Sequence, residues 1–269
     1  MASTDDASAG SKVDADVFRE SLELLRQTLC RYFRLEVHGG ENLPQGRCMI
    51  VGCHGGVMPY DAACTLVAVE QETGRLALSL GANMWGQIEL VDEFLSARGM
   101  FVGTREELAR RLDEENIVLV MPGGTEDMTR PIWRDAYRVL PHKGFARGKG
   151  GYIKTALETV SPIVPLAIVG TEEAHGLLWN STWLAGLLGT PFFPIVASPL
   201  PLPVKIYVRF GEPIHFAEEP EAANDQAVVD RLNLRVRRTV QELIDDTVER
   251  RSGIIWSSYD TSPRKPKRG

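Results

Sequence analysis

The amino-acid sequence predicts a single α/β domain, in which helices flank a central mixed, mostly parallel sheet. Short apolar runs of strand length alternate with amphipathic segments of about ten or more residues, which is the pattern of strand–helix–strand units. The linkers between these segments are short, and no internal repeat appears. The chain has 269 residues, of which 43% are hydrophobic and 25% charged, an ordinary composition for a globular domain.

The domain opens with an N-terminal amphipathic helix at residues 14–34, whose apolar side chains recur at three- and four-residue spacing. Apolar runs then predict strands at 48–53, 76–80, 100–102, 117–121 and 163–169. Helices are predicted between these strands at 59–70, 85–97, 105–114 and 151–159. A last strand at 204–210 precedes a long C-terminal amphipathic helix over 228–248.

The net charge of −6 comes from 30 basic and 36 acidic side chains, which are unevenly distributed. Residues 262–269 carry four basic side chains and no acidic one, so the rest of the chain is strongly acidic. An acidic body repels polyanions, and nucleic-acid binding is therefore not expected. We expect a folded domain over 13–256, a disordered N-terminal tail at 1–12 and a basic disordered tail at 257–269.

The four cysteines, at positions 30, 48, 53 and 64, are too few and too irregularly spaced for a disulfide framework. They form no CxxC pair, and the sequence has no HExxH motif, so no metal site is expected. Free thiols are typical of a reducing compartment, which indicates a cytoplasmic protein.

Residues 174–204 contain no Asp, Glu, Lys or Arg, which is unusual in a globular chain. Five prolines within this charge-free segment argue against a membrane-spanning helix, because each removes a backbone donor that lipid cannot replace. The part before the prolines would reach only about 21 Å as a helix, less than the bilayer core of about 30 Å. We expect the segment to be buried or to lie in a membrane interface.

A histidine and an aspartate follow the strand at 48–53. The run reads Cys53-His54-Gly55-Gly56-Val57-Met58-Pro59-Tyr60-Asp61. Loops at the carboxyl ends of strands carry catalytic groups in α/β folds, and paired glycines let the backbone turn sharply. Asp61 would fix the tautomer of His54, so that the other ring nitrogen accepts a proton. The alternative is that His54 ends the strand and Asp61 complements the helix dipole.

Two further strand ends carry polar groups. The strand at 117–121 leads into Gly123, Gly124, Thr125, Glu126 and Asp127, and the strand at 100–102 leads into Thr104 and Arg105. A hydroxyl and carboxylates at a glycine turn form a candidate binding site, and an ordinary capped turn is the alternative.

Four cations, Lys143, Arg147, Lys149 and Lys154, lie within twelve residues of a glycine-rich segment. Cations and exposed backbone amides suit a phosphorylated ligand. The alternative is a solvated basic loop.

The order of these motifs resembles that of the glycerolipid acyltransferase superfamily, which includes lysophosphatidic acid acyltransferases. That family carries a His-x4-Asp block, a Gly-x-x-Phe-x-x-Arg block, a Pro-Glu-Gly-Thr block and a final proline-containing strand. The matching stretches are residues 54–61, 99–105, 122–126 and 161–165. Residues 164–173 and 208–214 are most similar to the bacterial branch related to monoacylglycerol and type 2 diacylglycerol acyltransferases.

The sequence departs from the family pattern in two places. Six residues instead of four separate His54 from Asp61, and Gly123 stands where the family has glutamate, with no arginine directly after Thr125. Arginines in these blocks help to hold a phosphorylated acceptor in the family. The loss of one of these arginines favours a neutral alcohol, such as a mono- or diacylglycerol, as the acceptor. Arg105 is still present, so a phosphorylated acceptor stays an alternative.

The resemblance implies acyl transfer from an acyl-CoA or acyl carrier protein thioester to a hydroxyl of a glycerolipid or related lipid alcohol. It implies no permanently bound cofactor, and it makes His54 the general base and Asp61 the residue that orients it. The implied acceptor-binding residues are Thr104, Arg105, Gly123, Gly124, Thr125 and Glu126. The implied contacts to the thioester's phosphates are Lys143, Arg147, Lys149 and Lys154.

A lipid substrate gives the charge-free segment two alternative roles. Its aromatic side chains Trp179, Trp183, Phe192 and Phe193 either dock on a membrane interface or line an acyl-chain tunnel. We expect a protein peripheral to the inner, cytoplasmic face of the membrane. Two alternative functions are an N-acyltransferase or thioester hydrolase on the same fold, and a non-catalytic lipid- or acyl-thioester-binding protein.

Overall fold

The computed structural model describes residues 13–81, 89–188 and 193–262. Within these residues, seven strands form one sheet in the order β1-β9-β6-β2-β5-β3-β4. Their bounds are β1 Glu36–His38, β2 Cys48–Val51, β3 Ala77–Gly81, β4 Met100–Val102, β5 Ile117–Val120, β6 Ile163–Val169 and β9 Tyr207–Phe210. The five strands from β6 to β4 are parallel, and β9 runs antiparallel to β6. The predicted mixed, mostly parallel α/β sheet is confirmed.

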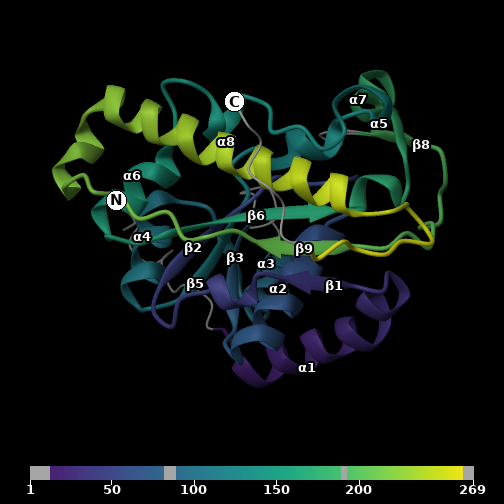
Figure 1. Cartoon of the computed structure of the whole chain (residues 1–269), viewed down its shortest axis with the longest axis horizontal. Helices are drawn as coiled ribbons and strands as arrows, with labels where there is room; N and C mark the ends of the chain where they lie inside the picture. Colours follow the sequence, from purple (N-terminus) through teal and green to yellow (C-terminus); the bar gives the residue numbers. More distant parts are fainter. Residues whose placement is uncertain (1–12, 82–88, 189–192, 263–269) are drawn as a thin grey trace, which may run out of the picture.

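Helices cover both faces of the sheet. The α-helices are α1 Ala15–Leu25, α2 Tyr60–Thr73, α3 Glu89–Ser96, α4 Arg105–Asp113, α5 Ile132–Asp135, α6 Gly151–Glu158, α7 Thr182–Leu188 and α8 Gln226–Arg250. Figure 1 shows α8 lying across one face and α1 and α2 on the opposite one. Helix α8 buries an apolar stripe at three- and four-residue spacing, which explains how the sequence periodicity predicts it. That stripe is Val229, Leu232, Val236, Val240 and Ile244.

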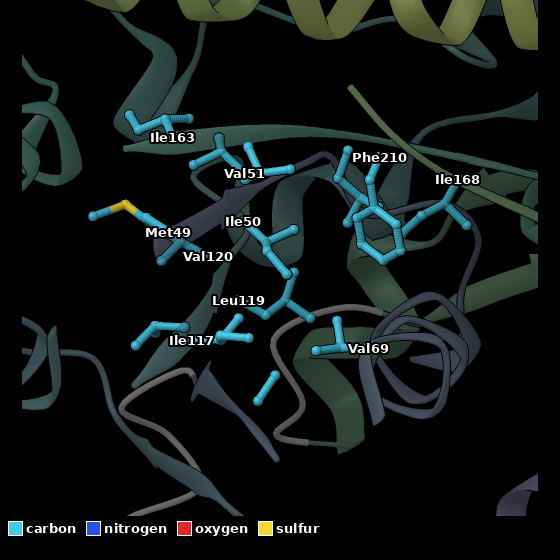
Figure 2. Packing of buried hydrophobic residues seen from close by; sticks show 14 of the residues in the cluster. Met49, Ile50, Val51, Val69, Ile117, Leu119, Val120, Ile163, Ile168 and Phe210 are labelled. Carbon is cyan, nitrogen blue, oxygen red and sulfur yellow. The ribbon is translucent and has the colours of Figure 1, made fainter. Parts of the chain in front are cut away.

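The core lies around the central strands. Every residue of β2, β5 and β6 is buried, because helices cover both faces of a parallel sheet and leave no polar side. Figure 2 shows Met49, Ile50 and Val51 of β2 beside Leu119 and Val120 of β5. This packing holds the carboxyl ends of the central strands in fixed positions, and the candidate site is built there.

The sequence patterns predict the short strand β4 but miss three other short strands among the described residues. Strand β1 has a single apolar residue, Val37, and is formed only because it pairs with β9. The charge-free segment forms a second, two-stranded antiparallel sheet from β7 Leu177–Asn180 and β8 Pro194–Val196, with α7 between them. The predicted helix at 85–97 is α3 in its described part, and its residues 85–88 lie outside the described residues.

Among the described residues, no helix combines the length and the apolar character that crossing a membrane requires. Within the segment 174–204 the side chains divide between core and surface: Leu177 is buried, whereas Trp183 is 73% exposed.

The described part of the C-terminal tail packs on the body. Tyr259 pairs with Arg251 in an antiparallel bridge, and its ring stacks on His38 at a centroid distance of 4.0 Å. Residues 257–262, which the sequence assigns to a disordered tail, are therefore in contact with the domain, and 263–269 lie outside the described residues.

Candidate active site

Three loops meet at one edge of the sheet. Strand β2 lies between β6 and β5 and is parallel to both, so the carboxyl ends of these strands face the same way. The loop after β2 carries His54, the loop after β5 carries residues 122–130, and the turn after β6 carries residues 170–173. Side chains that are far apart in the sequence are brought together at this edge, where α/β folds place their ligand sites.

His54 and Asp61 form a hydrogen-bonded pair. The Nδ1 atom of His54 lies 2.9 Å from Oδ2 of Asp61. The same carboxylate accepts hydrogen bonds from the backbone N–H of Gly55 at 2.8 Å and of Ala62 at 2.6 Å. Asp61 is fully buried in the first turn of α2, where the helix N-terminus favours a negative charge. The Gly55–Gly56 turn therefore absorbs the two extra residues between His54 and Asp61.

The pair defines the protonation of the imidazole. Because a carboxylate accepts, Nδ1 of His54 carries the proton and Nε2 presents its lone pair. Nε2 has no hydrogen-bond partner among the described residues, and 19% of the side chain is exposed. Burial lowers the pKa of His54, but the charge and hydrogen bond of Asp61 raise it, and the net direction is upward. The site thus holds a polarised imidazole with one accessible nitrogen.

Both glycines after His54 are required by their neighbour Thr171. A Cβ on Gly55 would lie 2.4 Å from Oγ1 of Thr171, and one on Gly56 would lie 2.5 Å from its main-chain oxygen. Gly56 also has a φ of +83°, a left-handed conformation that side chains rarely adopt. The loop after β2 is therefore in direct contact with the turn after β6.

The turn after β5 is shaped around Asp127. A Cβ on Gly123 would lie 2.0 Å from Oδ2 of Asp127, so this buried carboxylate excludes the glutamate that the wider family has at position 123. Oδ1 of Asp127 accepts from Nε2 of His142 at 2.8 Å, and Oδ2 accepts from the thiol of Cys53 at 3.0 Å. Burial raises the pKa of that thiol, and the Asp127 charge adds to the effect. Asp127 thus joins the turn to the end of β2.

Arg130 and Glu172 complete a buried charge network that sequence reasoning missed. The Nη2 atom of Arg130 donates to the main-chain carbonyl of His54 and lies 3.6 Å from Oε1 of Glu172. Burial raises the pKa of Glu172 to about 7, although the charge of Arg130 acts in the opposite direction. A clue was present in the sequence: Asp127 and Arg130 lie in the loop that follows β5, and Glu172 lies in the turn that follows β6.

The predicted acceptor-binding residues have separate positions. Thr104 caps α4, accepting from the backbone N–H of Glu107 at 3.1 Å, and Arg105 pairs with Glu158 of α6. Among the described residues, no hydrogen bond or ion pair connects Thr104 or Arg105 with His54 or Asp61. Gly123, Gly124, Thr125 and Glu126 belong to the loop after β5, and this loop is joined to His54 through Arg130.

The cationic segment lies against that turn. The backbone N–H of Gly144 donates to the carbonyl of Pro122 at 2.9 Å. Lys143 pairs with Glu126 at 2.8 Å, and Arg147, which is 95% exposed, lies 3.7 Å from Asp230 of α8. Lys149 extends the same loop, and Lys154 lies on α6. Lys143 is thus the cation of this group that reaches the turn after β5.

Exposed tryptophans gather beside the three loops. Trp179 on β7 is 55% exposed, and Trp183 on α7 is more exposed still. Trp133 on α5 is 69% exposed, and its indole N–H donates to the carbonyl of Leu178 at 2.9 Å, which joins α5 to β7. The sequence interpretation did not single out Trp133. Phe193 is half-buried, and Phe192 lies outside the described residues.

Neither a metal cluster nor the cavity described for this structure marks this site. Within the described ranges, no group of three or more His, Cys, Asp or Glu side chains is placed to hold a metal ion. A cavity of about 710 Å³ lies between β1, β9 and α8, and its lining residues include Arg209 and Asp246 but none from the three loops. The candidate active site is therefore defined by the chemistry of His54 and its neighbours.

Comparison with known proteins gives this geometry a family. A family model described as Acyltransferase matches residues 34–169, which include the His54–Asp61 pair and the loop after β5 and end with strand β6. The chain belongs to the acyltransferase family. An uncharacterized protein of Mycobacterium tuberculosis is 33% identical to this acyltransferase over 245 residues, covering 87% of this chain and 67% of the relative. The resemblance to the glycerolipid acyltransferase superfamily is confirmed, and the protein is an acyltransferase.

Two further comparisons are more distant. A mouse protein named DGAT1/2-independent enzyme synthesizing storage lipids is 24% identical over 215 residues, covering 78% of this chain and 59% of its own length. A crystal structure of the 1-acyl-sn-glycerophosphate (LPA) acyltransferase PlsC from Thermotoga maritima is 20% identical. Its TM-score with the present acyltransferase is 0.49, and the match covers 85% of this chain and 81% of that chain.

Proposed function

We propose that this acyltransferase moves a fatty acyl group from an acyl-CoA or acyl carrier protein thioester to a hydroxyl of a glycerolipid or related lipid alcohol. One observation carries the proposal: Nδ1 of His54 is held by the buried Asp61 carboxylate at 2.9 Å, while Nε2 remains without a protein partner among the described residues. This is the arrangement of a general base whose tautomer is fixed.

In the proposed reaction, Nε2 of His54 removes the proton from the acceptor hydroxyl as its oxygen attacks the thioester carbonyl carbon. The tetrahedral intermediate collapses when the carbon–sulfur bond breaks, and the thiolate leaves with the proton that the imidazolium returns. Asp61 stabilises the imidazolium between these steps and does not itself change protonation. Backbone amides of a glycine turn would stabilise the oxyanion, and general-base catalysis of this kind contributes about 10²–10⁴-fold.

We propose a neutral acceptor, such as a mono- or diacylglycerol. Glu126 occupies the position directly after Thr125 where the family has an arginine, and its carboxylate neutralises Lys143. Arg105 is paired with Glu158, so its charge is also balanced. The mouse relative, whose name assigns it to storage-lipid synthesis, supports the same acceptor class.

The test is an acceptor screen with labelled acyl-CoA, followed by mass spectrometry of the products. Monoacylglycerol and diacylglycerol are expected to be acylated at least about tenfold faster than lysophosphatidic acid, because an acidic side chain replaces a phosphate-binding arginine. A preference for lysophosphatidic acid would overturn the neutral acceptor. Free fatty acid released at the same rate with and without acceptor would indicate a hydrolase, and an N-acylated product would indicate an N-acyltransferase. Binding of acyl-CoA without turnover would indicate a non-catalytic protein.

We also propose that the exposed side chains of α5, β7 and α7 dock on the membrane at its cytoplasmic face. Trp133, Trp179, Trp183 and Leu187 form this surface, and all four are largely exposed. Tryptophan combines an apolar ring with a polar N–H and is favoured at the membrane interface. A docked orientation would bring the carboxyl edge of the sheet toward the lipid substrate.

A Trp179→Ala/Trp183→Ala double variant is expected to bind liposomes about tenfold or more weakly, because two interfacial aromatic side chains are removed. Liposome flotation at several anionic lipid fractions measures the change. The matched control is Phe94→Ala, which removes an exposed aromatic ring from α3, beside β4 at the edge of the sheet. Unaltered flotation of the double variant would refute the docking surface and leave the acyl-chain contact as its role.

A further inference from the structure

Arg130 is a buried arginine at the centre of the three loops. It follows the turn after β5, and its side chain is only 6% exposed. Nη2 donates to the main-chain carbonyl of His54, and Nε donates at 2.8 Å to the carbonyl of Asp127. Nη1 donates to the carbonyl of Arg138. One planar guanidinium thus binds a main-chain carbonyl of its own loop and connects it with the carbonyls of His54 and Arg138.

We propose that Arg130 is a positioning residue, which fixes the main chain of His54 and thereby the direction in which its imidazole meets the acceptor hydroxyl. The proposal rests on the proposed function, in which His54 is the general base. It also assigns a role to a buried arginine that lies five residues after Thr125.

The contacts of Arg130 need a guanidinium. Its N–H groups form a rigid fork, which can bind several carbonyls at once, whereas the ammonium of lysine is a single point of donation. The hydrogen bond from Arg130 to the main-chain carbonyl of His54 restricts the backbone at His54, and it thereby also fixes the position of the Cα atom from which the imidazole extends. Displacement of a catalytic group by about 1 Å costs up to about 10²-fold in rate.

The charges around Arg130 show why it is stable at this depth. Oδ1 of Asp127 lies 3.9 Å from Nε, and Oε1 of Glu172 lies 3.6 Å from Nη2. Asp127 and, in its ionised form, Glu172 therefore compensate the buried cation, as buried charges require. Asp127 is held in turn by His142, and both Glu172 oxygens accept from the backbone N–H of Tyr137 at 3.0 Å.

A second buried pair lies nearby but does not touch His54. Arg251, after α8, pairs with Glu173 at 2.6 Å, and both side chains are about as buried as those of Arg130 and Glu172. The Arg251 guanidinium lies 5.0 Å from the ring of Tyr137. This pair is a matched control, because its loss removes a buried arginine without freeing the main chain of His54.

The charged groups that face His54 make the pH profile a specific readout. They are Asp61 from α2 and Asp127 and Arg130 from the loop after β5, while Glu172 faces Arg130 from the turn after β6. Asp61 and Asp127 raise the pKa of His54, and Arg130 lowers it. Removing the cation therefore moves the acid limb of the kcat profile to higher pH, which a merely structural loss would not do.

The experiment compares Arg130→Met, Arg130→Lys and Arg251→Met in the full chain, with kcat and KM measured against pH and thermal unfolding measured for each. Arg130→Met is expected to lower kcat about 10–100-fold with KM changed less than about twofold, and to move the acid limb upward. Arg130→Lys is expected to restore the acid limb but not the full kcat. Arg251→Met is expected to lower the Tm and leave the kcat profile in place.

Wild-type kcat and an unmoved acid limb in Arg130→Met would overturn the proposal, as would an equal loss of kcat in Arg251→Met. If Arg130→Met does not fold, Arg130→Lys decides: full wild-type kcat in this variant contradicts the need for a guanidinium fork. The failure of this proposal is separate from the failure of the proposed function. A fully active His54→Ala variant would refute the assignment of His54 as the general base. An inactive His54→Ala variant together with wild-type activity and an unmoved acid limb in Arg130→Met would keep that assignment and refute only the positioning role of Arg130.

Discussion

His54→Ala is expected to lower kcat for acyl transfer by about 10²–10⁴-fold, because the variant has no group to take the acceptor proton. The side chain lies at the edge of the site and forms its described hydrogen bond with Asp61 alone, so its loss leaves the core intact. The rate is measured as thiol release from acyl-CoA in the presence of acceptor, with product formation followed by mass spectrometry.

The control for this variant is His215→Ala, which removes an exposed histidine outside the three loops. It is expected to keep wild-type kcat and KM. A His54→Ala protein with unchanged thioester turnover would show that another group is the base. Residual binding of acyl-CoA without turnover is the expected result, because binding does not depend on the imidazole.

Asp61→Asn is expected to lower kcat by an amount in the same range, about 10²–10⁴-fold, because the amide no longer fixes the tautomer or stabilises the imidazolium. In the wild type, Asp61 helps to raise the pKa of His54, so activity falls as the pH drops through a value above the ordinary one near 6.5. The acid limb of the kcat profile is therefore expected to move to lower pH in the variant.

The same variant has a predicted effect on stability. A raised histidine pKa stabilises the folded state fully below the unfolded pKa, and this contribution is lost as the pH rises through the folded pKa. Asp61→Asn should remove that dependence on pH. The difference in the free energy of unfolding between the wild type and the variant is therefore expected to grow in favour of the wild type as the pH is lowered. Denaturant unfolding at about pH 5.5 and about pH 8 measures it.

The control for the aspartate variant is Asp113→Asn, which neutralises an exposed carboxylate paired with Arg47. Its kcat profile is expected to match that of the wild type. An acid limb that stays in place in Asp61→Asn would show that Asp61 does not act on the titration of the base.

The central strands could be predicted because their signal is local. An apolar run such as Ile117–Val120 is a strand wherever helices cover it, and the structure places it within a residue of the predicted bounds. The long helix α8 is equally local, since its apolar side chains repeat along one face. Strand β1 gave no such signal, because it contains a single apolar residue. It forms through its pairing with β9, which is distant in the sequence.

The His54–Asp61 pair was predicted as one of two alternatives, and its geometry could not be read from spacing. Six intervening residues can be extended or folded back. The close approach of Thr171 to Gly55 and Gly56 compacts the loop, and the N-terminus of α2 then brings Asp61 within 2.9 Å of Nδ1. The hydrogen bond thus depends on a turn that follows a different strand.

In the cationic segment, the sequence predicted a grouping of side chains that the structure divides. Its composition predicted a common site for four basic side chains, because charge is visible in a sequence and pairing is not. Lys143 is paired with Glu126 and Arg147 lies near Asp230, so acidic partners from other segments divide the group. Contact of these cations with a thioester's phosphates stays a prediction.

The sequence by itself determined the α/β class, the buried central strands and the strand ends that carry polar groups, because apolar periodicity and glycine turns act over short distances along the chain. Only the tertiary structure decided that Arg130 holds the main chain of His54 and that Asp127 and Glu172 compensate its charge. The physical reason is the strand order: β5, β2 and β6 must pair before the side chains that follow them can meet.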